Sequence, residues 1–541
     1  MVGTDHTPSA GNGVACSAAQ NGLRVVISAV SAKESVAVGI VSVDRAVDCI
    51  NSVMSAALAV LSFVVNLRTL DLNFADAEVS LEVGHIVHGV PEAELYKRSQ
   101  SQCFFFGAVV GQHETVYFAG ICQRNKSGQF SSFIDCLFTA TSATCVTGIT
   151  VLDTFNYFNG FGQGVILALI QVGGLGFLTL VTFINLILGK KLGWSTVKIA
   201  ASDLTDNALE TTPKRLFYEI VLYSFAIEFV GAVILSFVFV PDFGALGIFE
   251  AIFLSVSAFC NAGFDLLTAT PGAVGLSEYT NNPLVMITLI VLITTGGLGF
   301  IVWRNIRHYN KTKRLLLHTK LVLIMAAVML LVGAAIIFIV EFGNRDTLGQ
   351  MPVGEKILTS IFLSASSRTA GFPCFDMNDL MPFTKIIITI LMFIGAAPAS
   401  TAGGIKITTV ALVVCTVISV LKGREDTYLM GHRIKRDAIY KTFTVIVLSL
   451  TLIAVSFTGI LMCCEGMSLQ KTIFEVVSAF STTGFSVGAS AEMNVPAKLI
   501  MIFTMLAGRI GPVTLMTSLI IRKNHNSDKN RILPEGNILV G

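Results

Sequence analysis

The sequence predicts an all-α, polytopic membrane protein made of four pseudo-symmetric repeats, each with a membrane helix, a half-length helix and a second membrane helix. Three observations predict this class: 53% hydrophobic and 13% charged residues, long apolar runs, and a small polar loop with glycine that recurs along the chain. Soluble domains carry about 25% charged residues, so this composition is typical of membrane proteins. The net charge of +2 gives no indication of a nucleic-acid partner, and the 11 cysteines show no metal-ligand spacing.

Apolar runs of spanning length define the long helices, since a spanning helix needs about 17–25 mostly apolar residues. The candidates are 161–189, 216–240, 283–303, 321–340, 386–420, 444–462 and 498–521. One more span is expected before residue 131, where the best run, 52–67, is short. The atypical region 1–128 has two explanations that stay open: a lineage-specific extension with 52–67 as the first span, or a frameshift or wrong start in the gene.

The loops between these spans alternate in charge. Loop 304–320 has several Lys and Arg residues and no acidic one, and 190–215, 422–441 and the tail from Arg522 are also basic. Loops 150–160, 241–248 and 265–282 contain no Lys or Arg. By the positive-inside rule, the basic set is cytoplasmic, and so is the C-terminus.

Shorter apolar segments, too short to span, precede the glycine loops. They are 131–144, 249–260, 355–367 and 470–481, and their loops contain Gly148, Gly263, Gly371 and Gly484. The nearly regular spacing of these glycines predicts an internal repeat. The repeats are 129–213, 214–320, 321–441 and 442–525, followed by a tail, 526–541.

Irregular backbone at membrane depth is tolerated only where it is buried in protein or lines a water-filled cavity. Each half-length helix would point its C-terminal end, with its partial negative charge, at the loop. A ring of backbone carbonyls replaces the hydration shell of a monovalent cation. The loops contain no ring of carboxylates, which would indicate a filter for divalent cations. The alternative, four merely external connections, does not explain their common register.

Several motifs resemble one known family: TATSATCVTGI at 139–149, LIQVGGLGF at 169–177, SRTAGF at 367–372, STAGGIK at 400–406 and AGRIGP at 507–512. They are similar to the membrane subunit of the Trk/Ktr/HKT potassium transporters, of the KtrB type, over about residues 129–525. The resemblance implies a single ion pathway with K⁺ as substrate. In this family, glycine in all four loops goes with potassium and serine in the first goes with sodium. The implied filter residues are Val146, Thr147, Gly148, Asn261, Ala262, Gly263, Thr369, Ala370, Gly371, Thr482, Thr483 and Gly484.

The resemblance also implies partners and a location. It implies a homodimer in the bacterial inner membrane, resting on a cytosolic KtrA/TrkA-like regulatory subunit that binds a nucleotide (ATP/ADP or NAD). The chain itself is expected to hold no cofactor. Whether Na⁺ is co-transported or acts as an activator stays open.

The long run 386–420 is interrupted by GAAPASTAGG at 395–404. In the family this is an intramembrane gate, with a buried arginine below the filter. The gate candidates are Ala396, Ala397, Pro398, Ala399, Ser400, Thr401, Ala402, Gly403, Gly404, Lys406 and Arg509. The alternatives are a proline kink for the loop, an interhelical salt bridge for Arg509, and a snorkelling side chain for Lys406.

Glu228 lies near the middle of its span. For this residue, a structural role is favoured over an ion site. Sodium transport through the same fold is the first rival function. A membrane-embedded enzyme or electron carrier would need clustered His, Cys or carboxylates, and the sequence has no catalytic motif. A secondary transporter of organic solutes would predict inverted repeats. The sequence therefore predicts a transporter and no enzyme.

Overall fold

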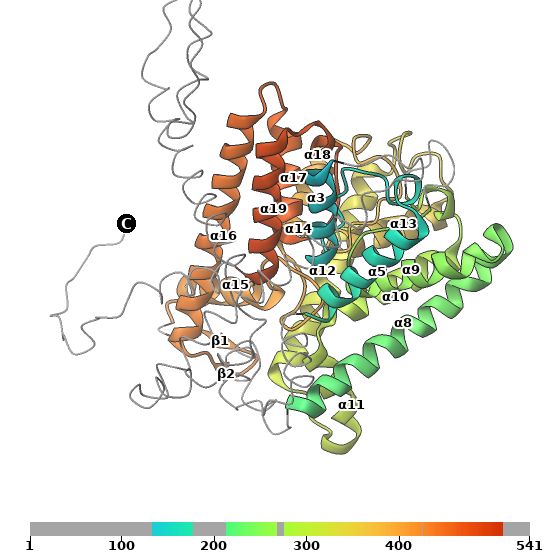
Figure 1. The fold of residues 1–541 in the computed structure, drawn as a ribbon. Helices are drawn as coiled ribbons and strands as arrows, with labels where there is room; N and C mark the ends of the chain where they lie inside the picture. Colours follow the sequence, from blue (N-terminus) through green and yellow to red (C-terminus); the bar gives the residue numbers. More distant parts are fainter. Residues whose placement is uncertain (1–131, 177–212, 268–274, 425, 512–541) are drawn as a thin grey trace, which may run out of the picture. The chain divides into compact units, whose positions relative to one another are not determined.

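The structure, a computed structural model, describes residues 132–176, 213–267, 275–424 and 426–511, all within the compact unit Pro91–Gly541. These residues are almost entirely helical (Figure 1). The longer helices are α3 (Phe133–Thr144), α5 (Gly160–Leu175), α8 (Pro213–Phe243), α9 (Leu246–Cys260), α10 (Pro283–Leu298), α11 (Phe300–Thr312), α12 (Leu317–Glu341), α13 (Val353–Ser366), α14 (Pro382–Phe393), α15 (Ile407–Leu421), α16 (Arg436–Cys463), α17 (Leu469–Ser481) and α19 (Val495–Ile510). Two short helices, α4 (Thr154–Tyr157) and α18 (Ala489–Glu492), and the 3-10 turn η3 (Ser277–Tyr279) lie in connections. The candidate span 52–67 and the tail 526–541 lie outside the described residues.

Among the residues that the structure describes, three single helices have the length and apolar character of a complete span. Within the described ranges, the helices with the length and hydropathy of a full span are Tyr218–Phe243, Leu317–Glu341 and Arg436–Cys463, with the bent pair α10 and α11 as a fourth if it is taken as one span. The prediction of an unbroken helix over 283–303 is wrong, because α10 and α11 meet at an angle of 96°. Gly299 between them has a φ of 85°, which a right-handed helix cannot contain. Gly176 after α5 and Gly511 after α19 have φ values of 84° and 93°, so these helices also end at a glycine.

Asparagine caps fix where three helices begin after the glycine loops. The side chains of Asn159, Asn282 and Asn494 accept hydrogen bonds from the N–H groups of Gly162, Leu284 and Ala497 at 2.8, 3.1 and 3.1 Å. Such caps satisfy donors that the first helical turn leaves unpaired. In α14, Pro382 occupies the first turn instead and has no N–H to satisfy. Each of these helices therefore starts at a position that the local sequence specifies.

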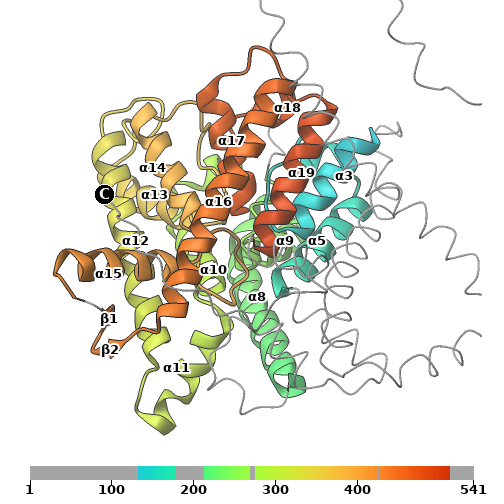
Figure 2. The ribbon, with the colours of Figure 1, turned by 90° about the vertical axis from the view of Figure 1, so that its left-hand side faces the viewer.

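Packing between the helices links each of the short helices α3, α9, α13 and α17 to the helices that follow the glycine loops. Helix α5 packs on α3 and also on α9, and α10 packs on α9 and also on α13. In the same direction, α14 packs on α17, and α19 packs on both α17 and α3. Figure 2 shows α19 beside α3 and α17, although more than 300 residues separate α3 from α19 in the chain. Each short helix therefore packs against at least one of the helices α5, α10, α14 and α19.

The long outer helices present apolar side chains outward. On α8, Leu222, Phe229 and Phe237 are 66%, 70% and 73% exposed. In the 18-residue apolar stretches that qualify α8, α12 and α16 as spans, only 33%, 28% and 22% is buried, respectively. Such a surface is unfavourable in water and favourable in lipid. The described part of the chain therefore fits a bilayer.

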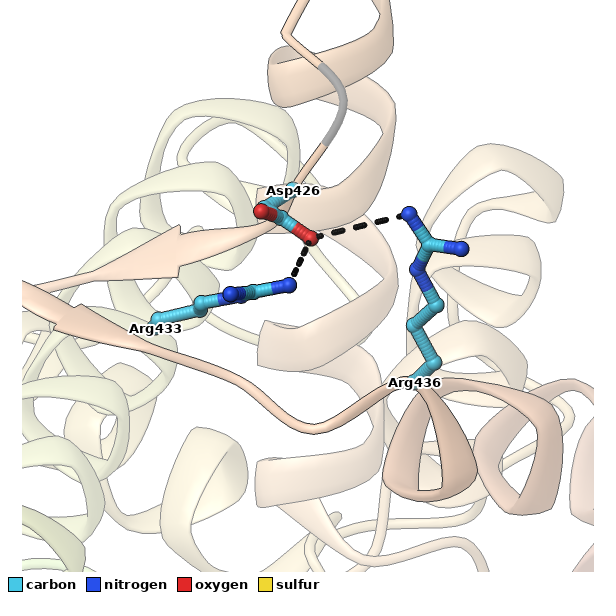
Figure 3. A network of polar contacts seen from close by, with 3 residues as sticks. All are labelled: Asp426, Arg433 and Arg436. Atoms are coloured by element: carbon cyan, nitrogen blue, oxygen red, sulfur yellow. Dashed lines mark hydrogen bonds and ion pairs between the residues drawn. The ribbon is translucent and has the colours of Figure 1, made fainter.

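One small hairpin departs from the all-α prediction. Strand β1 (Tyr428–Leu429) pairs antiparallel with β2 (His432–Arg433) in the connection between α15 and α16. Asp426 Oδ1 lies 2.9 Å from Arg433 Nη2 and 3.9 Å from Arg436 Nη2 (Figure 3). Exposed ion pairs contribute about 0–1 kcal/mol, so this carboxylate orients the turn more than it stabilises the fold.

Candidate functional site

The four glycine loops share a backbone conformation. In each, the glycine has a positive φ, and so does the residue two positions before it, which carries a side chain. The φ values are 57° for Val146, 59° for Asn261, 84° for Thr369 and 52° for Thr482, and 85°, 73°, 67° and 102° for Gly148, Gly263, Gly371 and Gly484. A left-handed conformation costs a residue with a side chain about 1–2 kcal/mol. Strain of this kind clusters at functional sites, where the surrounding packing enforces it.

The N–H groups of these loops point back to the short helices. Thr147, Ala262, Gly371 and Thr483 donate to the carbonyls of Ser142, Ser257, Ser366 and Ser478 at 2.7, 2.8, 2.9 and 2.9 Å. These bonds satisfy carbonyls that the helix ends leave unpaired. Among the described residues, no backbone hydrogen bond ends on the carbonyl of any of the four glycines or of the two residues before each. Backbone carbonyls without such partners are the kind of ligand that a desolvated cation needs.

The glycines bring the loops together in cyclic order. In each case, a methyl group on the glycine would approach the carbonyl oxygen of the residue before the next glycine more closely than real side chains allow. The pairs are Gly148 with Ala262, Gly263 with Ala370, Gly371 with Thr483 and Gly484 with Thr147. Any side chain at these positions would push two loops apart. The predicted filter residues of all four loops therefore lie in one place.

Glycines in α5, α10 and α19 pack directly on the ends of the short helices. A methyl group on Gly173, Gly296 or Gly508 would collide with the carbonyl of Thr144, Phe259 or Phe480, respectively. A residue without a side chain allows a helix to approach a neighbouring backbone this closely. Gly174 and Gly297 follow the first two of these glycines, whereas Arg509 follows the third. Arg509 therefore places a long side chain at a position where α5 and α10 have none.

The loop 395–404 is a true interruption and not a kink within one helix. Helix α14 ends at Phe393, α15 begins at Ile407, and Ile394 and Ile405 form a parallel bridge between them. Three backbone hydrogen bonds tie the loop to the break between α10 and α11: Ala397 N to Gly297 O at 3.1 Å, Phe300 N to Ala399 O at 3.0 Å and Thr401 N to Gly296 O at 3.4 Å. The loop therefore lies against the C-terminal ends of α10 and α9.

Arg509 contacts this loop from the opposite side. Its Nη1 donates to the carbonyl of Thr401 and its Nη2 to the carbonyl of Gly173. No carboxylate forms an ion pair with it within the described part of the chain, so these residues do not provide the alternative salt bridge. Lys406 does not simply snorkel, because its Nζ donates to the carbonyl of Ala402 in the same loop at 2.7 Å.

Glu228 is a buried carboxylate of α8 with a packing role. Its carboxylate is 3% exposed and accepts hydrogen bonds from Gln171 Nε2 at 3.1 Å and Cys260 Sγ at 3.8 Å. Its backbone carbonyl accepts from Ser255 Oγ at 2.7 Å. Glu228 therefore joins α8 to α5 and α9, in agreement with the structural interpretation.

Sequence reasoning missed Glu475, a fully buried carboxylate in α17. Its Oε1 accepts from Ser486 Oγ and from the N–H groups of Val487 and Ala489, and its Oε2 accepts from Ser490 Oγ at 3.0 Å. The carboxylate therefore holds the connection that follows Gly484. A charged residue inside a short apolar helix was the available signal.

Glu475→Gln is expected to destabilise the fourth loop. A glutamine amide presents N–H groups to at least one of the donors that the carboxylate now accepts, and an unsatisfied buried donor costs about 1–3 kcal/mol. The thermal unfolding midpoint of the purified protein should fall. Glu465→Gln, at an exposed position in the turn that follows α16, is the control and should leave the midpoint unchanged. An unchanged midpoint for Glu475→Gln would contradict the bracing role.

Comparisons with known proteins agree with this geometry. A family model, TrkH, described as a cation transport protein, matches residues 106–531. The chain is 37% identical over 421 residues to the potassium/sodium uptake protein NtpJ of Enterococcus hirae, covering 77% of this chain and 92% of that protein. It is 38% identical over 416 residues to the Ktr system potassium uptake protein B of Bacillus subtilis, covering 76% and 90%.

A solved structure has a similar fold. The crystal structure of the potassium transporter TrkH from Vibrio parahaemolyticus matches with a TM-score of 0.56, covering 72% of this chain and 79% of that one. The sequence identity is 19%, so this likeness concerns the fold alone.

Proposed function

Because the chain belongs to the TrkH family of cation transport proteins, we propose that it takes up potassium across the bacterial cell membrane, through a pore between the four glycine loops. The observation that carries the proposal is the ring of loops whose carbonyls are free of backbone hydrogen bonds. Two relatives named as potassium uptake proteins support the choice of ion. The family comprises transporters, so the chain is not an enzyme.

The chemistry of the loops suits a monovalent cation. A desolvated ion needs several oxygen ligands, and four sets of carbonyls supply them without a full negative charge. The short helices add the partial negative charge of their C-terminal ends. The hydroxyls of Thr147, Thr369 and Thr482 are buried without a hydrogen-bond partner among the described residues, which supports a polar pathway there.

Loop 395–404 and Arg509 form the proposed gate. The loop lies beneath the second glycine loop, and the guanidinium bonds it to α5 through Gly173. A fixed positive charge on the path of a cation raises the barrier to its passage. Opening would require the loop to leave Arg509, and the ion would then pass from the filter to the cytoplasm.

The proposed arrangement comprises four pseudo-symmetric repeats around the pore, with the basic loops and the C-terminus in the cytoplasm. The cyclic order of the glycine loops, together with the packing of α5, α10, α14 and α19 on the short helices, supports it. By family resemblance, the chain acts as a homodimer on a cytosolic nucleotide-binding subunit. The basic segment from Arg304 to Lys320 offers such a partner a positively charged surface.

Sodium is the second candidate ion, alone or alongside potassium. The relative from Enterococcus hirae is named a potassium/sodium uptake protein. Glycine in all four loops favours potassium, because a side chain there would change the spacing of the carbonyls.

Ion uptake tests the proposal directly. The full chain, together with a Ktr-type regulatory subunit, is expressed in bacteria that lack their own potassium uptake systems. We expect potassium uptake that exceeds sodium uptake under the same gradients. No potassium uptake at normal membrane expression would overturn the proposal, and sodium uptake alone would replace it with the second candidate.

A carboxyl group beside the second loop gives the proposed pore a pH dependence. Asp265 lies two residues after Gly263, outside the spanning helices, and accepts from Leu267 N at 3.2 Å. Burial, together with the charge of Asp153, raises the pKa of Asp265 to about 6. The group is therefore neutral below this pH and negative above it. At limiting potassium, we expect the uptake rate to rise between about pH 5 and about pH 7, because negative charge near the loops attracts cations.

The test compares the pH profile of uptake with that of Asp265→Asn. The variant should lose the step, since its side chain does not titrate. An identical step in the variant would assign the titration to another group.

A further inference from the structure

We propose that Thr401 couples the gate to the filter, by fastening loop 395–404 to the second glycine loop through a hydrogen bond to Asn261. The inference rests on the proposed function, because it assigns the two loops the roles of gate and filter. Thr401 acts here as a positioning residue: it is 1% exposed and reaches three other parts of the chain.

The hydroxyl of Thr401 has its proton and a lone pair both engaged. It donates to the carbonyl of Phe259, which can only accept, at 3.2 Å. The lone pairs that remain accept from Asn261 Nδ2 at 2.9 Å. The direction of both bonds is therefore determined, and with it the orientation of the Asn261 amide.

Asn261 is itself part of the proposed filter. It adopts the positive φ of 59° that its equivalents in the other loops share. Those equivalents are Val146, Thr369 and Thr482, so the second loop alone has an amide there. Only this loop can therefore reach the gate loop with a side chain of that length and two N–H donors.

The backbone of Thr401 completes the link. Its N–H donates to Gly296 at the break in the second repeat, and its carbonyl accepts from Arg509 of α19. Displacing the gate loop from Arg509 would also pull the Thr401 hydroxyl from Asn261. Opening the gate therefore releases the second glycine loop, and selectivity should depend on the state of the gate.

Thr401→Val tests the coupling, because valine has the shape of threonine without the hydroxyl. We expect faster potassium uptake together with an about two- to tenfold lower ratio of potassium to sodium uptake, the range that one net hydrogen bond corresponds to. Thr401→Ser keeps a hydroxyl and should retain most of the wild-type ratio. Thr384→Val is the matched control: its hydroxyl is also buried but has no hydrogen-bond partner in the described structure, so rate and ratio should stay unchanged.

A double-mutant cycle with Asn261→Thr separates coupling from independent effects. Threonine occupies this position in the third and fourth loops, so the backbone conformation tolerates it. If the hydrogen bond carries the effect, the double variant should have nearly the same ion ratio as either single variant. A ratio equal to wild type in Thr401→Val, or independent effects in the double variant, would overturn the coupling.

The same cycle is read from the thermal unfolding midpoint of the purified protein, which needs no transport. Non-additive midpoints in a chain that does not move potassium would leave the link between the loops standing and overturn only the proposed function. Additive midpoints would overturn the link whether or not the chain transports.

Discussion

Gly148→Ser is expected to abolish selective potassium uptake. At the φ of 85° that Gly148 adopts, a side chain is strained by about 1–2 kcal/mol. Its Cβ atom would also collide with the carbonyl of Ala262 and separate the first loop from the second. Because the carbonyl ring sets which ion replaces its hydration shell, the ratio of potassium to sodium uptake should fall by about tenfold or more. Uptake of both ions, in cells without their own potassium systems, measures this ratio.

Gly164→Ser provides the matched control on α5. No heavy atom lies within 4 Å of a methyl group at Gly164, and its φ is not positive, so both uptake rates should remain at wild-type levels. Gly371→Ser repeats the test in the third loop, where the added group would meet Thr483. A wild-type ion ratio in Gly148→Ser at equal membrane expression would contradict the filter.

The short helices and their glycine loops could be predicted from the sequence. The pattern that predicts them is local in the sequence: an apolar segment too short to span is followed by a loop with glycine, and this pattern recurs. The predicted segment 470–481 and α17, Leu469–Ser481, differ by one residue at the start. The interruption at 395–404 is local for the same reason, since Pro398 and the adjacent glycines cannot continue a helix.

The breaks at Gly176, Gly299 and Gly511 could not be predicted in this way. Hydropathy continues across Gly299, so the run 283–303 gives no sign of the 96° turn. Loop 395–404 occupies the space beside the turn: Pro398 O would lie 2.6 Å from a methyl group on Gly299. Contacts between distant segments decide this, and the same holds for the bonds of Thr401 to Asn261 and Arg509.

Arg509→Ala is expected to raise ion uptake. Removal of the guanidinium breaks its hydrogen bonds to Thr401 and Gly173 and removes a positive charge from the proposed pathway. Hydrogen bonds from charged donors contribute about 1.5–3 kcal/mol each, so a gate that loses them should open about tenfold more often or better. The arginine side chain does not favour membrane insertion, because an arginine within a spanning helix raises the free energy of insertion by at least about 2.5–3.5 kcal/mol. The variant should therefore reach the membrane normally, and potassium uptake at fixed expression measures the effect.

Arg509→Gln separates the charge from the hydrogen bonds. Its amide donates to one carbonyl at most and carries no charge, so uptake between wild type and Arg509→Ala would assign part of the barrier to the remaining bond. Uptake equal to that of Arg509→Ala would assign the barrier to the charge and to the second bond. Arg433→Ala removes an exposed arginine of the hairpin, 65% exposed in its side chain, and should leave uptake unchanged. If Arg509→Ala also transports at the wild-type rate, the guanidinium only joins α19 to its neighbours, and loop 395–404 must be held closed by its bonds to the second repeat.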